Sequence, residues 1–317
     1  MTRAEAAAFL ANGSDFLLLC HRNPDGDTTG CAAALCLGLR SLGKTAYLQP
    51  DPHCTDHRLT AYRAPLAPPD RYSPQTVVAV DTASAKLLPE GGPSAIDLVI
   101  DHHISHRPFG RFDYVEHAAA CGEVIFLLLR EMGVALDQSM AEALYLAIAT
   151  DTGCFRYGNT TPQTHRIVSA LMETGFDFFS VNERFFIIRS AARLKIEQSV
   201  LSNLELLSGG KVAILTLPLS LVQELGATAA DTDELSSLPR QIAGVQVGIT
   251  IQEKPDHCKL SVRTARNRSA TEICAQLGGG GHRQAGGCTV AGDIETARAA
   301  VLNALAQVHP DAWTGDC

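Results

Sequence analysis

The amino-acid sequence predicts an α/β fold of two domains joined by a long helix. A length of 317 residues exceeds one average domain, and 46% hydrophobic residues are enough for two buried cores. Short apolar runs alternate with helical stretches in the N-terminal half, and a second α/β pattern begins after Gly209 and Gly210. We expect a doubly wound, mostly parallel sheet in residues 1–184. A connecting helix in 185–208 leads to a smaller α/β domain in 209–317, with the active site in the cleft between the domains.

The N-terminal half contains the elements of a parallel sheet. Residues 17–19, 77–80 and 98–100 are short apolar runs, as expected of strands buried on both faces. Residues 28–42, 121–132 and 139–150 have the composition and apolar spacing of helices. Residues 50–74 are rich in proline and are predicted to form a long loop.

The C-terminal half begins with the predicted connecting helix. Residues 178–207 contain neither proline nor glycine, so one helix is expected to run through them and to end at Gly209 and Gly210. Strands are predicted at 212–217, 245–251 and 259–262, and helices at 270–277 and 295–307. A cluster of glycines separates the two helices.

Charge and cysteine usage restrict the function. The formal net charge of −8 excludes a global basic surface for long duplex nucleic acid, so a small anionic substrate would need a local positive site. Ten cysteines without a CxxC pair indicate reduced thiols, and no apolar run approaches the roughly 20 residues of a membrane span. We predict a cytoplasmic protein without a membrane partner.

Acidic and histidine residues follow the predicted strands of the first half. The carboxyl ends of parallel strands line the ligand crevice of an open sheet, so these residues are expected to meet at one edge. A single Asp in such a place is usually a helix cap or turn residue, but four segments contribute here. The candidate residues are His21, Asp25, Asp27, Asp81, Asp101, His102, His103 and Asp151.

The charge of this cluster predicts metal ions. Four carboxylates crowded together would repel one another strongly if no cation were present. Two divalent cations would neutralise them, and oxygen and nitrogen ligands without thiolate suit Mn²⁺ or Mg²⁺, with imidazole favouring Mn²⁺. We therefore predict two Mn²⁺ ions as cofactors, with Mg²⁺ as the alternative, in a site suited to phosphoryl chemistry.

The motifs resemble those of the DHH phosphoesterases. The matching segments are HisArgAsnProAspGlyAsp from His21, the Asp81 that follows its strand, AspHisHis from Asp101, and AspThrGlyCysPheArg from Asp151. The glycine-rich segment 278–287 resembles a motif of the family's associated C-terminal domain. The resemblance covers nearly the whole chain and is greatest to the bifunctional oligoribonuclease and PAP phosphatase branch.

The resemblance implies a role for each matching residue. His21, Asp25 and Asp81 would hold one metal, and Asp27, Asp81, His102 and Asp151 the other, so that Asp81 bridges. His103 would contact the scissile phosphate or protonate the leaving group, and Asp101 would hold its neighbours in place. Residues implied to contact the rest of the substrate are Arg156, Arg263, Gly279, Gly280, Gly281, His282 and Arg283.

Three positions depart from the family pattern. Thr264 follows Arg263 where serine is usual, which keeps a hydroxyl group. Cys121 stands where threonine is common, so a hydroxyl contact there is in doubt. His106 follows the AspHisHis motif where asparagine is frequent. None of the three is an implied metal ligand.

The resemblance implies hydrolysis of short RNA or DNA oligonucleotides, linear dinucleotides such as pApA, or 3′-phosphoadenosine-5′-phosphate. Alternatives are a RecJ-like single-strand exonuclease, an inorganic pyrophosphatase and a catalytically silent nucleotide-binding regulator. A homodimer remains open. A zinc site formed by His53 and His57 is disfavoured, because these histidines lie between prolines in the predicted loop.

Overall fold

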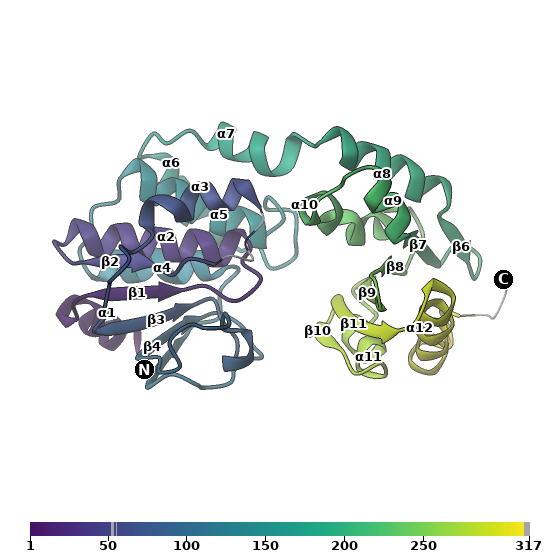
Figure 1. The fold of residues 1–317 in the computed structure, drawn as a ribbon, viewed down its shortest axis with the longest axis horizontal. Coiled ribbons are helices and arrows are strands. Elements are labelled where there is room, and N and C mark those ends of the chain that lie inside the picture. Colours follow the sequence, from purple (N-terminus) through teal and green to yellow (C-terminus); the bar gives the residue numbers. More distant parts are fainter. Residues whose placement is uncertain (52–53, 55, 314–317) are drawn as a thin grey trace. The chain divides into compact units, whose positions relative to one another are not determined.

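The structure is a computed structural model that describes residues 1–51, 54 and 56–313. The chain divides into two compact units, Met1–Ile188 and Arg189–Cys317. Each unit contains one β-sheet with helices packed against it (Figure 1). The predicted α/β class with a parallel N-terminal sheet and a second sheet is therefore confirmed. None of the helices in the described part of the chain is long and apolar enough to cross a membrane.

The sheet of the first unit has five strands, and all neighbouring strands are parallel. Its order is β2-β1-β3-β4-β5. The three central strands bury both faces, which explains the continuous apolar runs in the sequence. The strands are β1 (Phe16–Leu19), β2 (Ala46–Leu48), β3 (Thr76–Val80), β4 (Leu98–Asp101) and β5 (Phe112–Val115).

Helices cover one face of this sheet. Leu18, Val78 and Ile100 belong to one core together with apolar residues of α1 (Arg3–Asn12), α2 (Gly26–Ser41), α4 (Cys121–Glu131) and α5 (Gln138–Asp151). The alternate strand residues face the opposite way and form a smaller core. Side chains from irregular segments, among them Tyr72, Leu88 and Phe109, cover that second face.

Helices α2 and α5 approach closely at Gly30, and this contact places Asp27 on α2 near Asp151 on α5. A Cβ atom at Gly30 would lie 2.2 Å from the carbonyl oxygen of Ala143. Because backbone cannot move aside easily, we expect Gly30→Ala to lower the free energy of unfolding by about 1–3 kcal/mol in urea denaturation. Gly38→Ala on the same helix is the control, since its Cβ would meet only the end of the Leu129 side chain. Equal effects of the two substitutions would contradict this explanation.

The segment 50–74 is not the long loop that its prolines predict. It contains helix α3 (His57–Arg63), followed by a short 3₁₀ helix at Ala64–Leu66. The Asp56 side chain starts α3 by accepting a hydrogen bond from the backbone N–H of Arg58 at 2.9 Å. His53 lies outside the described residues. Strands β2 and β5 and helix α6 (Pro162–Met172) also went unpredicted, because they are short or mixed in polarity.

The predicted single helix over residues 178–207 is wrong. Helix α7 (Phe178–Asn182) passes into a π-helical turn at Glu183–Ile187, and the backbone is extended at Ile188. Ser190 then caps a new helix, α8 (Ala191–Ser202), by accepting from the backbone N–H of Arg193 at 2.9 Å. The last residues form strand β6 (Glu205–Leu207). Gly209 and Gly210, with φ of 65° and 82°, form its turn and do not end a helix.

The second unit contains a mixed sheet of six strands. Their order is β10-β11-β9-β8-β7-β6, and only β7 and β8 run parallel. Val212 and Ile214 of β7 pack toward α11 (Ala270–Ala275) and α12 (Ile294–Val308), whereas Leu215 and Leu217 pack toward α8. The other strands are β7 (Val212–Leu217), β8 (Val247–Glu253), β9 (His257–Thr264), β10 (Gly280–His282) and β11 (Ala285–Ala291). Short helices at Leu219–Glu224, Ala229–Thr232 and Asp233–Gln241 complete the unit.

Candidate active site

The acidic and histidine residues of the first unit meet at the carboxyl edge of its sheet. His21 follows β1, Asp81 follows β3, and Asp101 ends β4, from which His102 and His103 continue. Asp25 caps the N-terminus of α2, and its side chain accepts from the backbone N–H of Thr28 at 3.1 Å. Asp151 differs from the others because it lies at the end of helix α5 and not after a strand.

Three groups of potential metal ligands lie at this edge, and two of them contain Asp81, namely His21, Asp25 and Asp81, and Asp81, His102 and His103. In the first group, Nε2 of His21 lies 3.7 Å from Oδ2 of Asp25 and 3.8 Å from Oδ2 of Asp81. The Asp81 carboxylate thus extends from this group toward the second one. Within each of the three groups, the third of which is Asp27, His102 and Asp151, ligand atoms lie within 4.8 Å of one another. Such spacing matches donors around a common centre.

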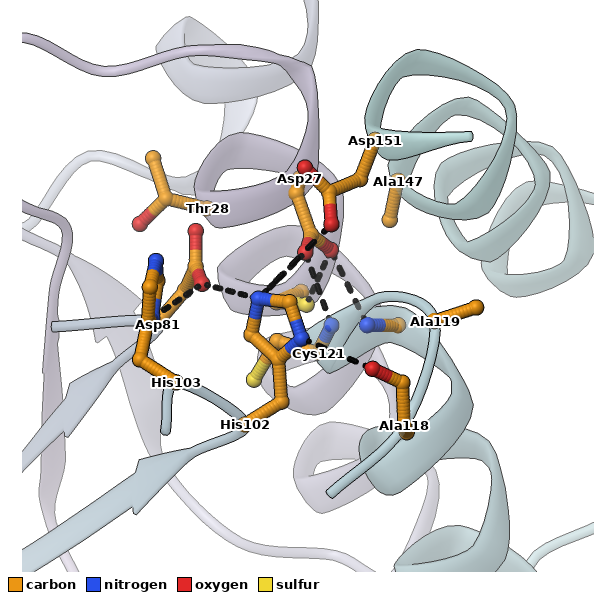
Figure 2. A network of polar contacts seen from close by, with 12 residues as sticks. Asp27, Thr28, Asp81, His102, His103, Ala118, Ala119, Cys121, Ala147 and Asp151 are labelled. Atoms are coloured by element: carbon orange, nitrogen blue, oxygen red, sulfur yellow. Dashed lines mark hydrogen bonds and ion pairs between the residues drawn. The ribbon is translucent and has the colours of Figure 1, made fainter. Parts of the chain in front are cut away.

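The other two groups share His102, and three carboxylates surround its Nε2 (Figure 2). This nitrogen lies 3.7 Å from Oδ2 of Asp27, 3.5 Å from Oδ1 of Asp81 and 3.7 Å from Oδ2 of Asp151. Nδ1 of His102 lies 3.1 Å from the Ala118 carbonyl oxygen. If Nδ1 carries the hydrogen, that contact leaves Nε2 with its lone pair toward the three carboxylates, as a metal ligand requires.

The N-terminus of α4 holds Asp27. The backbone N–H groups of Cys121 and Gly122 donate to its two carboxylate oxygens at 2.7 and 2.9 Å, and the Cys31 thiol donates at 3.2 Å. A helix N-terminus stabilises a negative charge at this place. Asp27 does not need a threonine hydroxyl at position 121, because the backbone N–H of Cys121 supplies the donor.

Asp81 is buried and has an unfavourable backbone conformation. Its φ is +52°, in the left-handed region that costs a non-glycine residue free energy. Its Oδ1 atom is buried and has no hydrogen-bond partner among the described residues, although imidazole nitrogens of His102 and His103 lie 3.5 and 3.7 Å away. A buried carboxylate oxygen without a donor indicates that something absent from the protein chain satisfies it.

The carboxylates destabilise one another's charged forms. Burial and the neighbouring carboxylates Asp151 and Asp25 raise the pKa of Asp27 far above its ordinary value. Burial, followed by the charges of Asp27 and other neighbours, does the same to the pKa of Asp81. Burial and the charge of Asp25 raise the pKa of Asp151 to about 7. This donor set lacks positive charge, and divalent cations fit it.

Asp101 orients both histidines that follow it. It is fully buried, and its Oδ1 accepts from the backbone N–H of His102 at 2.9 Å and from Nδ1 of His103 at 2.7 Å. Burial alone would raise the pKa of Asp101, but the hydrogen bond and charge of His103 outweigh it and lower that pKa. Burial likewise opposes the charged form of His103, yet its bond to Asp101 raises the pKa of His103 above the ordinary value.

The predicted substrate residues of the second unit also gather in one place. Arg263 on β9 pairs with Ala285, directly beside the turn that joins β10 to β11. Its guanidinium donates to Oγ of Ser236 at 3.1 Å and to the Gly286 carbonyl oxygen at 3.4 Å. Arg283 lies exposed in the same turn. Sequence reasoning missed Ser236, which carries no motif.

The glycine cluster is a strand and not a flexible loop. Gly280 and Gly281 belong to β10, where Gly281 pairs with Gly286. A Cβ at Gly279 would lie 2.2 Å from the Gly287 carbonyl oxygen, and one at Gly281 would lie 2.4 Å from that of Ala285. The close approach of the strands therefore requires these two glycines, whatever else they contact. The His282 side chain lies outside the described part of the structure.

Arg156 lies in the exposed turn after Asp151. Its Nε donates to the Gly153 carbonyl oxygen at 2.7 Å. The turn has three consecutive residues with positive φ, namely Gly153, Cys154 and Phe155. Asn159, which sequence reasoning missed, ties this turn to the site by donating to the carbonyl oxygens of Ala119 and Asp151 at 2.8 and 3.1 Å.

Fold and site together define a class of protein. The site consists of carboxylates and imidazoles at the carboxyl edge of a parallel sheet, in groups that fit divalent cations. Such a site is typical of a metal-dependent phosphoesterase. Comparison with known proteins agrees. Residues 15–148 match the DHH family N-terminal domain, and residues 209–308 match the DHHA1 domain.

The particular family follows from curated relatives. The bifunctional oligoribonuclease and PAP phosphatase NrnA of Thermus thermophilus is 31% identical over 90% of this chain and 87% of its own length. The NrnA of Bacillus subtilis is 24% identical over 70% of this chain and 72% of its own. The chain therefore belongs to the DHH family of phosphoesterases, in its NrnA branch.

Solved structures show the same fold. The crystal structure of an exopolyphosphatase-related protein from Bacteroides fragilis has a TM-score of 0.85, with 22% identity over 98% of this chain and 97% of that chain. RecJ of Thermus thermophilus in complex with Mn²⁺ has a TM-score of 0.55 and 17% identity. That match covers 98% of this chain but only 54% of RecJ.

Proposed function

We propose that this DHH phosphoesterase hydrolyses very short oligonucleotides, including linear dinucleotides, and 3′-phosphoadenosine-5′-phosphate to mononucleotides. The observation that carries the proposal is the cluster of ligand groups around the buried Asp81 and His102. The names of the curated relatives support the substrate class. The acidic net charge of −8 supports a substrate with few phosphates, because long strands gain affinity from many basic contacts.

Two divalent ions, with Mn²⁺ preferred to Mg²⁺, would occupy this cluster. His21, Asp25 and Asp81 would hold one ion, and Asp27, Asp81, His102 and Asp151 the other. Such ions activate water and offset the negative charge that develops on a phosphoryl group. RecJ of Thermus thermophilus, which has the same fold, is solved in complex with Mn²⁺ and in complex with Mg²⁺, and the imidazole ligands are the reason to prefer Mn²⁺ here.

His103 would supply the proton for the leaving group. Nδ1 donates to Asp101, so Nε2 is the ring nitrogen left for proton transfer. The raised pKa of His103 favours the protonated form that a general acid needs. In hydrolysis the oxygen of water bonds to phosphorus, the bond from phosphorus to the leaving oxygen breaks, and that oxygen takes the proton from His103.

The second unit would bind the part of the substrate remote from the broken bond. Arg263 would contact a phosphate through its guanidinium, and the β10–β11 turn would add Arg283, His282 and backbone N–H groups of Gly279, Gly280 and Gly281. Arg156 in the first unit would contribute a further positive charge. The grouping of Arg263 with the β10–β11 turn supports this assignment.

Substrate length tests the proposal. We expect turnover to be highest on 5′-phosphorylated RNA or DNA of roughly two to five nucleotides, and at least about tenfold lower on a single strand of about 20 nucleotides. The measurement is initial rate against length with Mn²⁺ and with Mg²⁺, with 3′-phosphoadenosine-5′-phosphate and inorganic pyrophosphate as additional substrates.

Each alternative predicts a different result in the same assay. Degradation of the long strand at a comparable rate would indicate a RecJ-like exonuclease, and preference for pyrophosphate would indicate a pyrophosphatase. Binding of nucleotides without turnover of any substrate would indicate a silent regulator. All three results would contradict the proposed function.

A further inference from the structure

A buried row of side chains leads from His103 away from the carboxylate groups. Asp101 accepts from Nδ1 of His103 through Oδ1 and from Nδ1 of His106 through Oδ2, both at 2.7 Å. Nε2 of His106 lies 3.1 Å from Oδ1 of Asp113. The side chains of His106 and Asp113 are only 6% and 16% exposed. The row therefore runs from His103 through Asp101 and His106 to Asp113.

These contacts hold the His106 ring between two carboxylates. Both oxygens of Asp101 accept hydrogen bonds, and Oδ1 of Asp113 also accepts from the backbone N–H groups of Phe109 and Gly110 at 3.3 and 3.5 Å. Each ring nitrogen of His106 therefore faces a carboxylate oxygen, Nδ1 that of Asp101 and Nε2 that of Asp113. The two contacts at opposite sides of the imidazole fix the position of the His106 ring between the two carboxylates.

The backbone makes the row rigid. Asp113 stands on β5 opposite Val99 of β4, so its place relative to Asp101 is set by the sheet. The backbone N–H of His106 donates to the His103 carbonyl oxygen at 3.2 Å, which closes the turn between the two histidines. Rotation of the Asp101 carboxylate away from His103 would leave a buried oxygen without its donor, which is costly.

We propose that His106, held by Asp113, is a positioning residue for the hydrolysis reaction, acting through Asp101 on His103. The hydrogen bond between His106 and Oδ2 of Asp101 fixes this carboxylate, so its Oδ1 stays directed at Nδ1 of His103. His103 then presents Nε2 to the leaving oxygen in one orientation. This inference rests on the proposed function, in which His103 protonates the leaving group. It also gives a physical role to the histidine that departs from the family's frequent asparagine.

Two substitutions at position 106 test the contact with Asp101 and the contact with Asp113 separately. The side-chain amide of asparagine can replace Nδ1 and keep the bond to Asp101. The amide of glutamine can replace Nε2 and keep the contact with Asp113, but it loses Asp101. Both variants are neutral and similar in size. The proposal therefore predicts that His106→Asn retains most of the activity and that His106→Gln does not.

The leaving group provides the diagnostic measurement. Thymidine 5′-phosphate can be released from a 5′-phosphorylated dinucleotide, whose leaving oxygen needs a proton, or from its p-nitrophenyl ester, whose leaving group does not. For His106→Gln in the intact chain with Mn²⁺, we expect kcat to fall about tenfold on the dinucleotide and less than about threefold on the ester. KM, bound manganese and the unfolding temperature should stay near wild type. Asp113→Asn, which keeps an acceptor for Phe109 and Gly110, should change the ratio of the two rates in the same direction.

Several results would overturn the proposal. They are equal losses on both esters, loss of manganese from His106→Gln, or a loss in His106→Asn as large as that in His106→Gln. An unchanged ratio of rates in Asp113→Asn and His106→Gln together would also do so. Failure of the proposed function is a separate result, because the wild-type chain itself would then not hydrolyse the dinucleotide.

Discussion

Asp81→Ala should abolish hydrolysis, with a loss of about a thousandfold or more, and should reduce bound manganese. Asp81 belongs to the group of His21 and Asp25, and its Oδ1 lies 3.5 Å from Nε2 of His102, so its removal would take a donor from each proposed ion. Asp81→Asn is the cleaner variant, because asparagine tolerates the φ of +52° at this position. Turnover and metal content of the purified variants are the measurements. Wild-type turnover of either variant at saturating Mn²⁺ would refute the dinuclear assignment.

A matched control and a stability measurement complete this test. Asp97→Asn removes a carboxylate that lies before β4, at the opposite edge of the sheet, where Oδ2 accepts from the backbone N–H of Val77 at 2.9 Å. It should leave metal content unchanged. Without metal, Asp81→Asn should be more stable than wild type by roughly 1–3 kcal/mol, because it removes an unsatisfied buried carboxylate. With added Mn²⁺, the wild type should become more stable than Asp81→Asn.

Much of the fold and the placement of the site residues followed from sequence for a simple geometric reason. The carboxyl ends of parallel strands share one edge, so Asp81 and His102 had to come together once their strands were recognised. Asp151 reached the same place by another route, at the end of a helix that packs on α2. The structure brings these residues together, and their roles as ligands remain proposals.

The features that sequence could not predict depend on contacts that residue type alone does not reveal. The donors to Asp27 are backbone N–H groups of Cys121 and Gly122, which any residue other than proline would supply. The break in the connecting helix depends on Ser190, which could equally stand inside a helix. Pairing with β7 draws residues 205–207 into a strand although their composition suits a helix. The partner of Asp27 is distant in sequence, whereas the cap at Ser190 and the pairing of β6 with β7 are local contacts that outweigh helix propensity.

Arg263→Ala should lower kcat/KM on a dinucleotide by about ten- to a hundredfold, the loss expected for one charge-assisted contact of about 1.5–3 kcal/mol. Metal content should not change, because the proposed ligands all belong to the first unit. Hydrolysis of bis-p-nitrophenyl phosphate should change little, since that ester lacks the remote part of a nucleotide. Binding energy from a remote contact can also help to position the phosphate, so either kcat or KM can carry the loss.

The alternative explanation is that Arg263 only supports its own unit. It donates to Ser236 and to the Gly286 carbonyl oxygen, so its removal could loosen the sheet. Arg266→Ala is the matched control, because Arg266 is an exposed arginine of the same short basic segment. Arg263→Lys separates charge from geometry, since lysine keeps the charge but cannot form a two-pronged contact with phosphate. A role in binding predicts intermediate activity for Arg263→Lys and normal activity for Arg266→Ala, with unfolding temperatures near wild type. Equal losses on both esters, together with a lower unfolding temperature, would show that Arg263 stabilises the fold and does not bind the substrate.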